Sequence, residues 1–229
     1  MNTHSFTGKS QAYAIARPSY PDEAIRYIRS LVPVDAVFAD IGAGTGKFSI
    51  LIAKCGYEVF AVEPNADMRE QLVTTLAPFP NARIVEGAAE ASTLADSSID
   101  VITCAQALGW FNLDKFKAEC RRIGKPGAIV ISIHNEMPGD DFVPSNNRLT
   151  NKRAAEVFFK DLVSKKFSNP ISYTREKWLS YNASISDNPQ PLDQGYEVHV
   201  TELNAIFDSE NVAGLLRHNL ITRVCSGII

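Results

Sequence analysis

The chain has 229 residues, of which 45% are apolar, so it is long enough to bury the core of a single α/β domain. Its 23 lysines and arginines against 26 acidic residues leave a net charge of −3 with no basic block, which argues against broad attraction to nucleic acid or to an anionic membrane. Four scattered cysteines without metal-site spacing, and a polar N-terminus without a long apolar run, favour a cytoplasmic protein with no metal site whose partner is a small molecule.

The first predicted element is a helix that begins at Pro21 and ends before Pro33. Two acidic residues follow Pro21, which suits the first turn of a helix, and Ile25, Ile28 and Leu31 fall on one face. This helix is expected to be scaffold.

Residues 37–49 predict a buried strand, a glycine turn and the start of a helix in immediate succession. Gly42, Gly44 and Gly46 stand at alternate positions, so the backbone can turn sharply and approach a ligand, and the following helix is expected to point unpaired N–H groups at it. Asp40 ends an otherwise apolar strand. Its carboxylate should either bind the loop or meet a cationic group of the ligand.

A second predicted strand, residues 57–62, leads directly into Glu63. An acidic side chain at this point is placed to accept both ribose hydroxyls of a nucleoside held by the glycine loop. This feature alone does not separate an adenosine-containing methyl donor from NAD. Asn65 is expected to cap a helix whose apolar ladder runs through Met68 and Leu72.

Further strands and helices alternate along the rest of the chain. Strands are expected at residues 82–86, 99–105, 128–133 and, last, around 216–224; helices are expected after Asn112, around 154–162, after Thr174, and around 203–207. This alternation predicts a doubly wound parallel sheet with a ligand crevice at the carboxyl ends of its strands.

Several short motifs occur in the order found in one enzyme family. They are D-I-G-A-G-T-G (40–46), Glu63, G-A-A-E (87–90), Q-A-L-G-W-F (106–111) and K-P-G (125–127). Together they resemble class I methyltransferases that use S-adenosylmethionine, in the small-molecule branch that includes trans-aconitate methyltransferases. The resemblance implies a Rossmann-like seven-stranded sheet with an antiparallel last strand, helices on both faces and a helical substrate lid. Within one domain, 1–229, it implies a cofactor-covering segment (1–33), a cofactor-binding core (34–136), a lid with connecting elements (137–212) and the last strand (213–229).

The resemblance also implies the roles of individual residues. Tyr13 and Arg17 would face the methionine carboxylate, and Gln106 and Ala107 would border the methyl-donor pocket. The adenine side would be formed by Met68, Ala88, Ala89 and Glu90. The residues expected to line the acceptor pocket are Trp110, Tyr173, Trp178 and Tyr181. Gly109 stands where the branch commonly has histidine, which should leave room for a bulkier or more apolar substrate.

The predicted reaction is transfer of a methyl group from S-adenosylmethionine to an oxygen, nitrogen or carbon nucleophile. Proximity and in-line orientation suffice for an activated donor, so no dedicated base is required; His134 and Glu136, directly after the fifth strand, are the candidates if one is used. One alternative is a protein that binds S-adenosylmethionine without methyl transfer, as a sensor or regulatory subunit. An NAD-dependent oxidoreductase is disfavoured by the glycine spacing and by the lack of a Y-x-x-x-K pair. The oligomeric state stays open.

Overall fold

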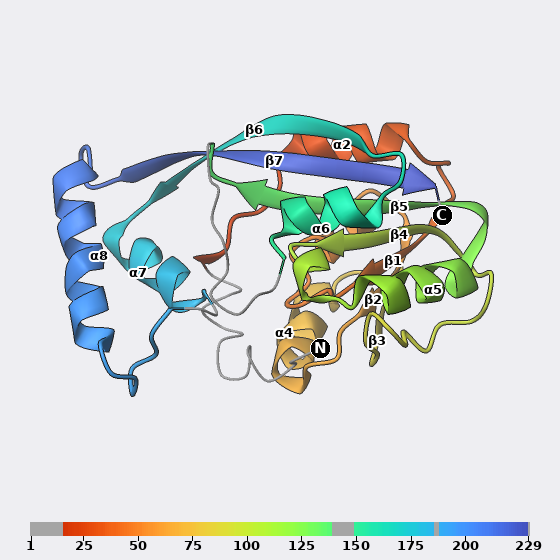
Figure 1. Cartoon of the computed structure of the whole chain (residues 1–229), viewed down its shortest axis with the longest axis horizontal. Coiled ribbons are helices and arrows are strands. Elements are labelled where there is room, and N and C mark those ends of the chain that lie inside the picture. The colour runs from red at the N-terminus through yellow and green to blue at the C-terminus, as the bar shows by residue number, and fades with distance from the viewer. Residues whose placement is uncertain (1–15, 139–148, 186–187, 229) are drawn as a thin grey trace.

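The computed structural model describes residues 16–138, 149–185 and 188–228, and these form a seven-stranded sheet in the order β3-β2-β1-β4-β5-β7-β6 (Figure 1). In chain order the strands are β1 (Val37–Ile41), β2 (Glu58–Val62), β3 (Ala82–Val85), β4 (Ile99–Ala105), β5 (Gly124–Glu136), β6 (Val163–Tyr173) and β7 (Leu216–Ile228). Strands β1 to β5 run parallel, and β7 is antiparallel to both of its neighbours. The predicted doubly wound sheet with an antiparallel last strand is confirmed.

Helices cover both faces of this sheet. They are α2 (Asp22–Ser30), α3 (Ser49–Lys54), α4 (Ala66–Leu76), α5 (Leu113–Ile123), α6 (Asn151–Phe158), α7 (Arg175–Ala183) and α8 (Tyr196–Glu210), with a short 3-10 turn η2 (Leu108–Trp110) after β4. Ile28 of α2 and Ile52 of α3 pack with Val59 on one face, while Phe116 of α5 and Phe158 of α6 share a cluster on the other. Because both faces are covered, the central parallel strands are apolar runs rather than alternating patterns.

Side-chain caps start several helices where the sequence predicts them. The side chains of Asn65, Asn112 and Thr174 accept hydrogen bonds from the backbone N–H groups three residues further on, at 3.0, 3.2 and 3.3 Å. Each satisfies an N–H group that has no partner within its own helix. The helix after the glycine loop begins at Ser49, one residue later than the apolar pattern suggests.

Strand β6 lies within the predicted segment of lid and connecting elements. Residues 163–173 lie inside the segment 137–212 that the resemblance assigns to lid and connecting elements, yet they pair with β7 along their whole length and form the edge of the sheet. Most side chains of the first half of β6 are exposed, among them Lys165 and Lys166. An edge strand with so few buried positions has little apolar alternation, and exposed lysines are typical of such edges.

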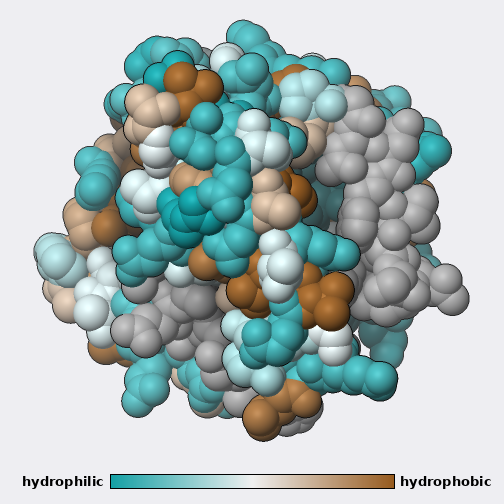
Figure 2. All heavy atoms as spheres, turned by 90° about the vertical axis from the view of Figure 1, so that its left-hand side faces the viewer, coloured by the Kyte–Doolittle hydropathy of each residue, from teal (hydrophilic) through white to brown (hydrophobic). Residues whose placement is uncertain are grey.

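The lid proper, α7 and α8, lies at one end of the molecule, where β6 and β7 extend beyond the other strands (Figure 1). Its small core contains Tyr173, Trp178, Leu203 and Phe207, and the indole N–H of Trp178 donates to the carbonyl of Leu203 at 3.0 Å. Figure 2, which views the molecule from this end, shows a mostly hydrophilic surface with separate apolar spots. Nowhere in the described ranges is there a helix with the length and apolar character needed to cross a bilayer.

Candidate functional site

The glycine loop turns at the carboxyl end of β1 in a conformation that requires glycine. Gly42, Gly44 and Gly46 have φ angles of +71°, +58° and +86°, which side-chain-bearing residues rarely adopt. A Cβ at Gly46 would also lie 2.7 Å from Leu72 Cδ1, so this glycine allows the loop to pack against α4. The predicted loop is therefore present.

The N–H groups of the first half of the loop are bonded within the protein. The N–H groups of Gly42 and Ala43 both donate to the carbonyl of Val62, at 2.9 and 3.0 Å, and that of Gly44 donates to Glu63 Oε2 at 2.8 Å. The loop is thus bound to the end of β2. Its preorganised shape, rather than unpaired N–H groups at these positions, is what it offers a ligand.

Glu63 sits at the centre of this arrangement. Its other oxygen, Oε1, accepts from the N–H of Asn65 at 2.9 Å, and only 7% of the residue is exposed. Burial raises the pKa of Glu63, against the two backbone hydrogen bonds that lower it. A carboxylate oxygen can accept two hydrogen bonds, so each oxygen keeps capacity for one hydroxyl group. This fits the predicted contact with a ribose.

Asp40, at the end of β1, is hydrogen-bonded to the elements on either side of the loop. The residue is 1% exposed and does not line the pocket; its Oδ2 accepts from the Ser49 hydroxyl at 2.6 Å and its Oδ1 from the Thr103 hydroxyl at 3.1 Å. These bonds join β1, β4 and the first residue of α3. Both partners are hydroxyl groups outside the glycine loop, so among the described residues Asp40 connects the elements around the loop, and its predicted role toward a ligand stays a prediction.

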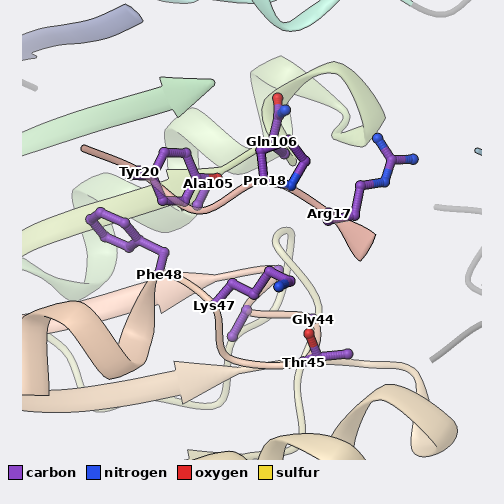
Figure 3. Close-up of a pocket in the computed structure, with 11 residues that line it drawn as sticks. Arg17, Pro18, Tyr20, Gly44, Thr45, Lys47, Phe48, Ala105 and Gln106 are labelled. Atoms are coloured by element: carbon purple, nitrogen blue, oxygen red, sulfur yellow. The ribbon is translucent and has the colours of Figure 1, made fainter. Parts of the chain in front are cut away.

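A pocket opens between the glycine loop, the end of β4 and the segment before α2 (Figure 3). Its walls are formed by Arg17, Pro18, Tyr20, Gly42, Ala43, Gly44, Thr45, Lys47, Phe48, Ala105 and Gln106. Of the predicted cofactor-binding residues, Arg17, Gly42, Gly44 and Gln106 are in this wall. Tyr13 lies outside the described residues. The pocket is at the carboxyl ends of β1 and β4, where the topology places a ligand crevice.

Arg17 links this pocket to the lid. Its Nη2 donates to the carbonyl of Ser184 at 3.0 Å, and its guanidinium lies 5.3 Å from the centre of the Tyr181 ring. Figure 3 shows the guanidinium turned away from the glycine loop. Tyr181, one of the predicted substrate residues, therefore contacts a residue of the pocket wall.

Gly109 does not leave room for a larger substrate, contrary to the sequence prediction. A Cβ at this position would lie 2.3 Å from the carbonyl oxygen of Leu149, and the N–H of Gly109 donates to Asn151 Oδ1 at 3.0 Å. The space that the family's histidine would need is filled by the backbone at the start of α6. Asn151 also donates to Gln106 Oε1 at 3.2 Å, so α6 helps to hold the pocket wall.

The residues next to Gly109 pack beneath the loop. A Cβ at Gly42 would meet Ala107 Cβ at 3.0 Å and the Phe111 ring at 3.2 Å, so Ala107 closes the loop from behind. Trp110 is half-buried and packs against the hydrophobic cluster on the α5 side.

The residues predicted for the adenine side differ in exposure. Met68 and Ala89 are buried, whereas Ala88 and Glu90 are half-buried and Glu90 Oε1 accepts from the N–H of Asn112 at 2.9 Å. Ala88 pairs with Ala91 in a tight turn. The half-buried carboxylate of Glu90 and the backbone groups at Ala88 are the polar groups that this side offers to an adenine ring.

Two of the predicted substrate residues form the core of the lid. Tyr173 and Trp178 are buried, with ring centres 5.9 Å apart, and Trp178 is fixed by its hydrogen bond to Leu203. The hydroxyl of Tyr173 has no hydrogen-bond partner among the described residues, and burial raises the pKa of this phenol. Neither ring is in the pocket wall.

His134 and Glu136 lie on β5 outside the pocket wall. His134 is buried with Nε2 3.3 Å from Glu136 Oε2, and Arg223 of β7 binds Glu136 with Nη2 2.6 Å from Oε1. Burial would raise the pKa of Glu136, but contacts with His134 and Arg223 together lower it to about 2. Its geometry is that of an ion pair between β5 and β7.

Seven residues of the pocket wall were not among the predicted site residues; they are Pro18, Tyr20, Ala43, Thr45, Lys47, Phe48 and Ala105. Thr45 and Lys47 belong to the glycine loop itself, and both side chains enter the pocket. Their position within the motif was a signal, since residues between closely spaced glycines flank any ligand that the loop holds. Among the described residues, the pocket wall contains two cationic side chains and no carboxylate.

Comparisons with known proteins agree with this geometry. Residues 39–132 match the model of a methyltransferase domain family. An uncharacterized methyltransferase of Mycobacterium tuberculosis is 37% identical over 124 residues, which are 54% of this chain and 49% of that protein. Another of Schizosaccharomyces pombe is 28% identical over 217 residues, 85% of this chain and 84% of that protein. The matched part thus spans about half the length of the mycobacterial relative.

Solved structures show the same fold. One named as a type II methyltransferase of Anaeromyxobacter dehalogenans superimposes with a TM-score of 0.69 at 20% identity, covering 93% of this chain and 97% of that one. A phosphoethanolamine N-methyltransferase of Haemonchus contortus, in complex with phosphomonomethylethanolamine and S-adenosylhomocysteine, gives 0.61 at 14% identity over 99% of this chain and 59% of its own. The chain is therefore similar in sequence to a methyltransferase domain family over residues 39–132, and over most of its length it has the fold of solved methyltransferases.

Proposed function

We propose that the protein transfers a methyl group from S-adenosylmethionine to an oxygen, nitrogen or carbon atom of a small molecule. The observation that carries the proposal is the bond between Gly44 and Glu63. It fixes the glycine loop in a shape that only glycines allow and holds a carboxylate with spare acceptor capacity next to the pocket.

S-adenosylmethionine, when bound, supplies a methyl group already activated by a positively charged sulfur. The residues of this chain then have to bind, orient and exclude water. In the proposal, Glu63 accepts hydrogen bonds from the ribose hydroxyls. The backbone of the glycine loop packs against S-adenosylmethionine, and Gln106 forms the pocket wall at the end of β4. Ala88, Ala89, Glu90 and Met68 stay the predicted adenine side.

No general base is part of the proposal. Glu136 is occupied by Arg223, and His134 is buried beside it, so neither is placed to take a proton from an acceptor in the pocket. Alignment of acceptor, methyl group and sulfur is the remaining contribution of the protein. Acceptors that are already anionic or uncharged nucleophiles at neutral pH fit this arrangement best.

The acceptor is proposed to be a small molecule and the location cytoplasmic. All four cysteines are free thiols, three of them buried, which supports a reducing compartment. Because residues 106–111 resemble the trans-aconitate branch, carboxylic acids are the first acceptors to screen. Binding of the methyl donor without turnover of any acceptor would instead favour a sensor or regulatory subunit.

The test is isothermal titration of the whole protein with S-adenosylhomocysteine and, separately, with NADH. We expect dissociation constants in the micromolar range for the former and no binding of the latter. Glu63→Gln should weaken S-adenosylhomocysteine binding roughly 10-fold, because one acceptor oxygen is replaced by a donor group. Thermal melting of the variant shows whether it is folded; a folded variant with wild-type affinity would remove Glu63 from the site.

A further inference from the structure

Lys47 is a cationic side chain in the pocket wall that the proposed function has not used. It follows Gly46 in the loop, and its side chain is half-buried. Within the described part of the chain no carboxylate pairs with its ammonium group, and burial alone lowers the pKa of Lys47. A half-buried ammonium group without a counter-ion is unfavourable until an anion binds beside it.

The hydroxyl of Thr45 is a second group without a partner at the same place. Thr45 is 2% exposed, and its Oγ1 makes no hydrogen bond with any residue that the structure describes. Thr45 and Lys47 both line the pocket, and Figure 3 shows both side chains at the glycine loop. A buried hydroxyl without a hydrogen bond costs stability that a ligand acceptor would restore. Both groups are donors, so they call for an acceptor with negative charge.

Only one group of the methyl donor is both a hydrogen-bond acceptor and negatively charged. Its sulfonium and its amino group are cationic at neutral pH and would be repelled by Lys47, and its ribose hydroxyls are met by Glu63 in the proposed function. The carboxylate of its methionine part is its single anion. Arg17, which the family resemblance assigns to that carboxylate, is instead bonded to Ser184 and stacked on Tyr181.

We propose that Lys47, with the hydroxyl of Thr45, binds the carboxylate of the methyl donor's methionine part, and that Arg17 holds the lid. This inference rests on the proposed function, because it needs S-adenosylmethionine in the pocket. It assigns the amino-acid end of the donor to the loop residues 45–47 rather than to the segment before α2.

The experiment compares two ligands that differ by the amino-acid part. S-adenosylhomocysteine contains the carboxylate, and 5′-methylthioadenosine lacks it. We expect Lys47→Met to weaken binding of S-adenosylhomocysteine about 10- to 100-fold, the range for loss of a charge-assisted contact, and to leave methylthioadenosine binding unchanged. Lys47→Arg should retain most of the affinity. Lys54→Met, at the exposed end of α3, is the matched control and should change neither ligand.

The outcomes separate the inference from the function on which it rests. If the wild-type protein binds neither ligand, the proposed function fails and the inference with it. If the wild type binds S-adenosylhomocysteine and Lys47→Met binds it equally well, the inference alone is overturned. Equal weakening of both ligands would show that Lys47 shapes the nucleoside site, and a strong effect of Arg17→Ala together with a silent Lys47→Met would return the carboxylate to Arg17.

Discussion

Asp40 is a buried carboxyl group that is stabilised by hydroxyl groups. Burial raises its pKa from 3.8 to about 6, although the hydrogen bonds from Ser49 and Thr103 act in the opposite direction. A carboxyl group with a higher pKa in the folded than in the unfolded state stabilises the fold while it is protonated. That contribution is complete below the unfolded pKa and is lost as the pH rises through the folded pKa.

Asp40→Asn should therefore gain stability relative to wild type as the pH rises from about 4 to about 7. The pH-dependent part of the gain should reach up to about 3 kcal/mol, since each pKa unit corresponds to about 1.4 kcal/mol. Urea denaturation at several pH values measures the difference in the free energy of unfolding between the variant and the wild type. A change caused by altered hydrogen bonding is the same at every pH, so it does not affect the pH-dependent part. A difference that stays the same at every pH would contradict the assignment.

Sequence reasoning predicted the proximity of those residues whose place follows from chain order. Asp40, the glycines and Glu63 stand at strand ends, and parallel strands bring their carboxyl ends to one edge. The direction of the Lys47 and Thr45 side chains could not be predicted in this way. Between left-handed glycines the backbone follows neither the period of a helix nor that of a strand, so the face to which a side chain points is set only by the folded loop.

At the scale of elements, Gly109 joins η2 to α6. Because a Cβ would overlap the Leu149 carbonyl, Gly109→Ala should displace the start of α6 and lower the free energy of unfolding by about 1–3 kcal/mol, the usual range for overpacking. Gly109→His, which restores the family's residue, should destabilise more. Thermal melting measures the loss, and hydrogen exchange over residues 149–158 locates it. Unchanged melting with unchanged exchange in α6 would show that this packing is loose.

Elements were predictable where the signal is local. The caps at Asn65, Asn112 and Thr174 require only a side chain and an N–H group three residues away. Strand β6 was missed because its pairing partner, β7, is more than 40 residues further along the chain and its own side chains are mostly exposed. The antiparallel place of β7 followed from family resemblance, since periodicity carries no information on strand direction.

At the scale of the whole molecule, Arg17, in the segment before α2, connects the lid to the pocket. S-adenosylhomocysteine should slow hydrogen exchange in the loop, residues 42–47, and also in residues 181–185, because Arg17 lines the pocket and bonds to Ser184. In Arg17→Ala the loop should still be protected while residues 181–185 lose their protection. Lid protection that survives in this variant would mean that other contacts carry the coupling.

The way in which the lid is attached to the sheet has a consequence for how this fold can vary. Tyr173 and Leu216, the residues at which the chain leaves the sheet and returns to it, stand directly opposite each other on neighbouring antiparallel strands. Everything between them is attached at one paired point, like the loop of a β-hairpin. An exchange of residues 174–215 for a segment of another length or sequence should therefore leave the register of every strand unchanged.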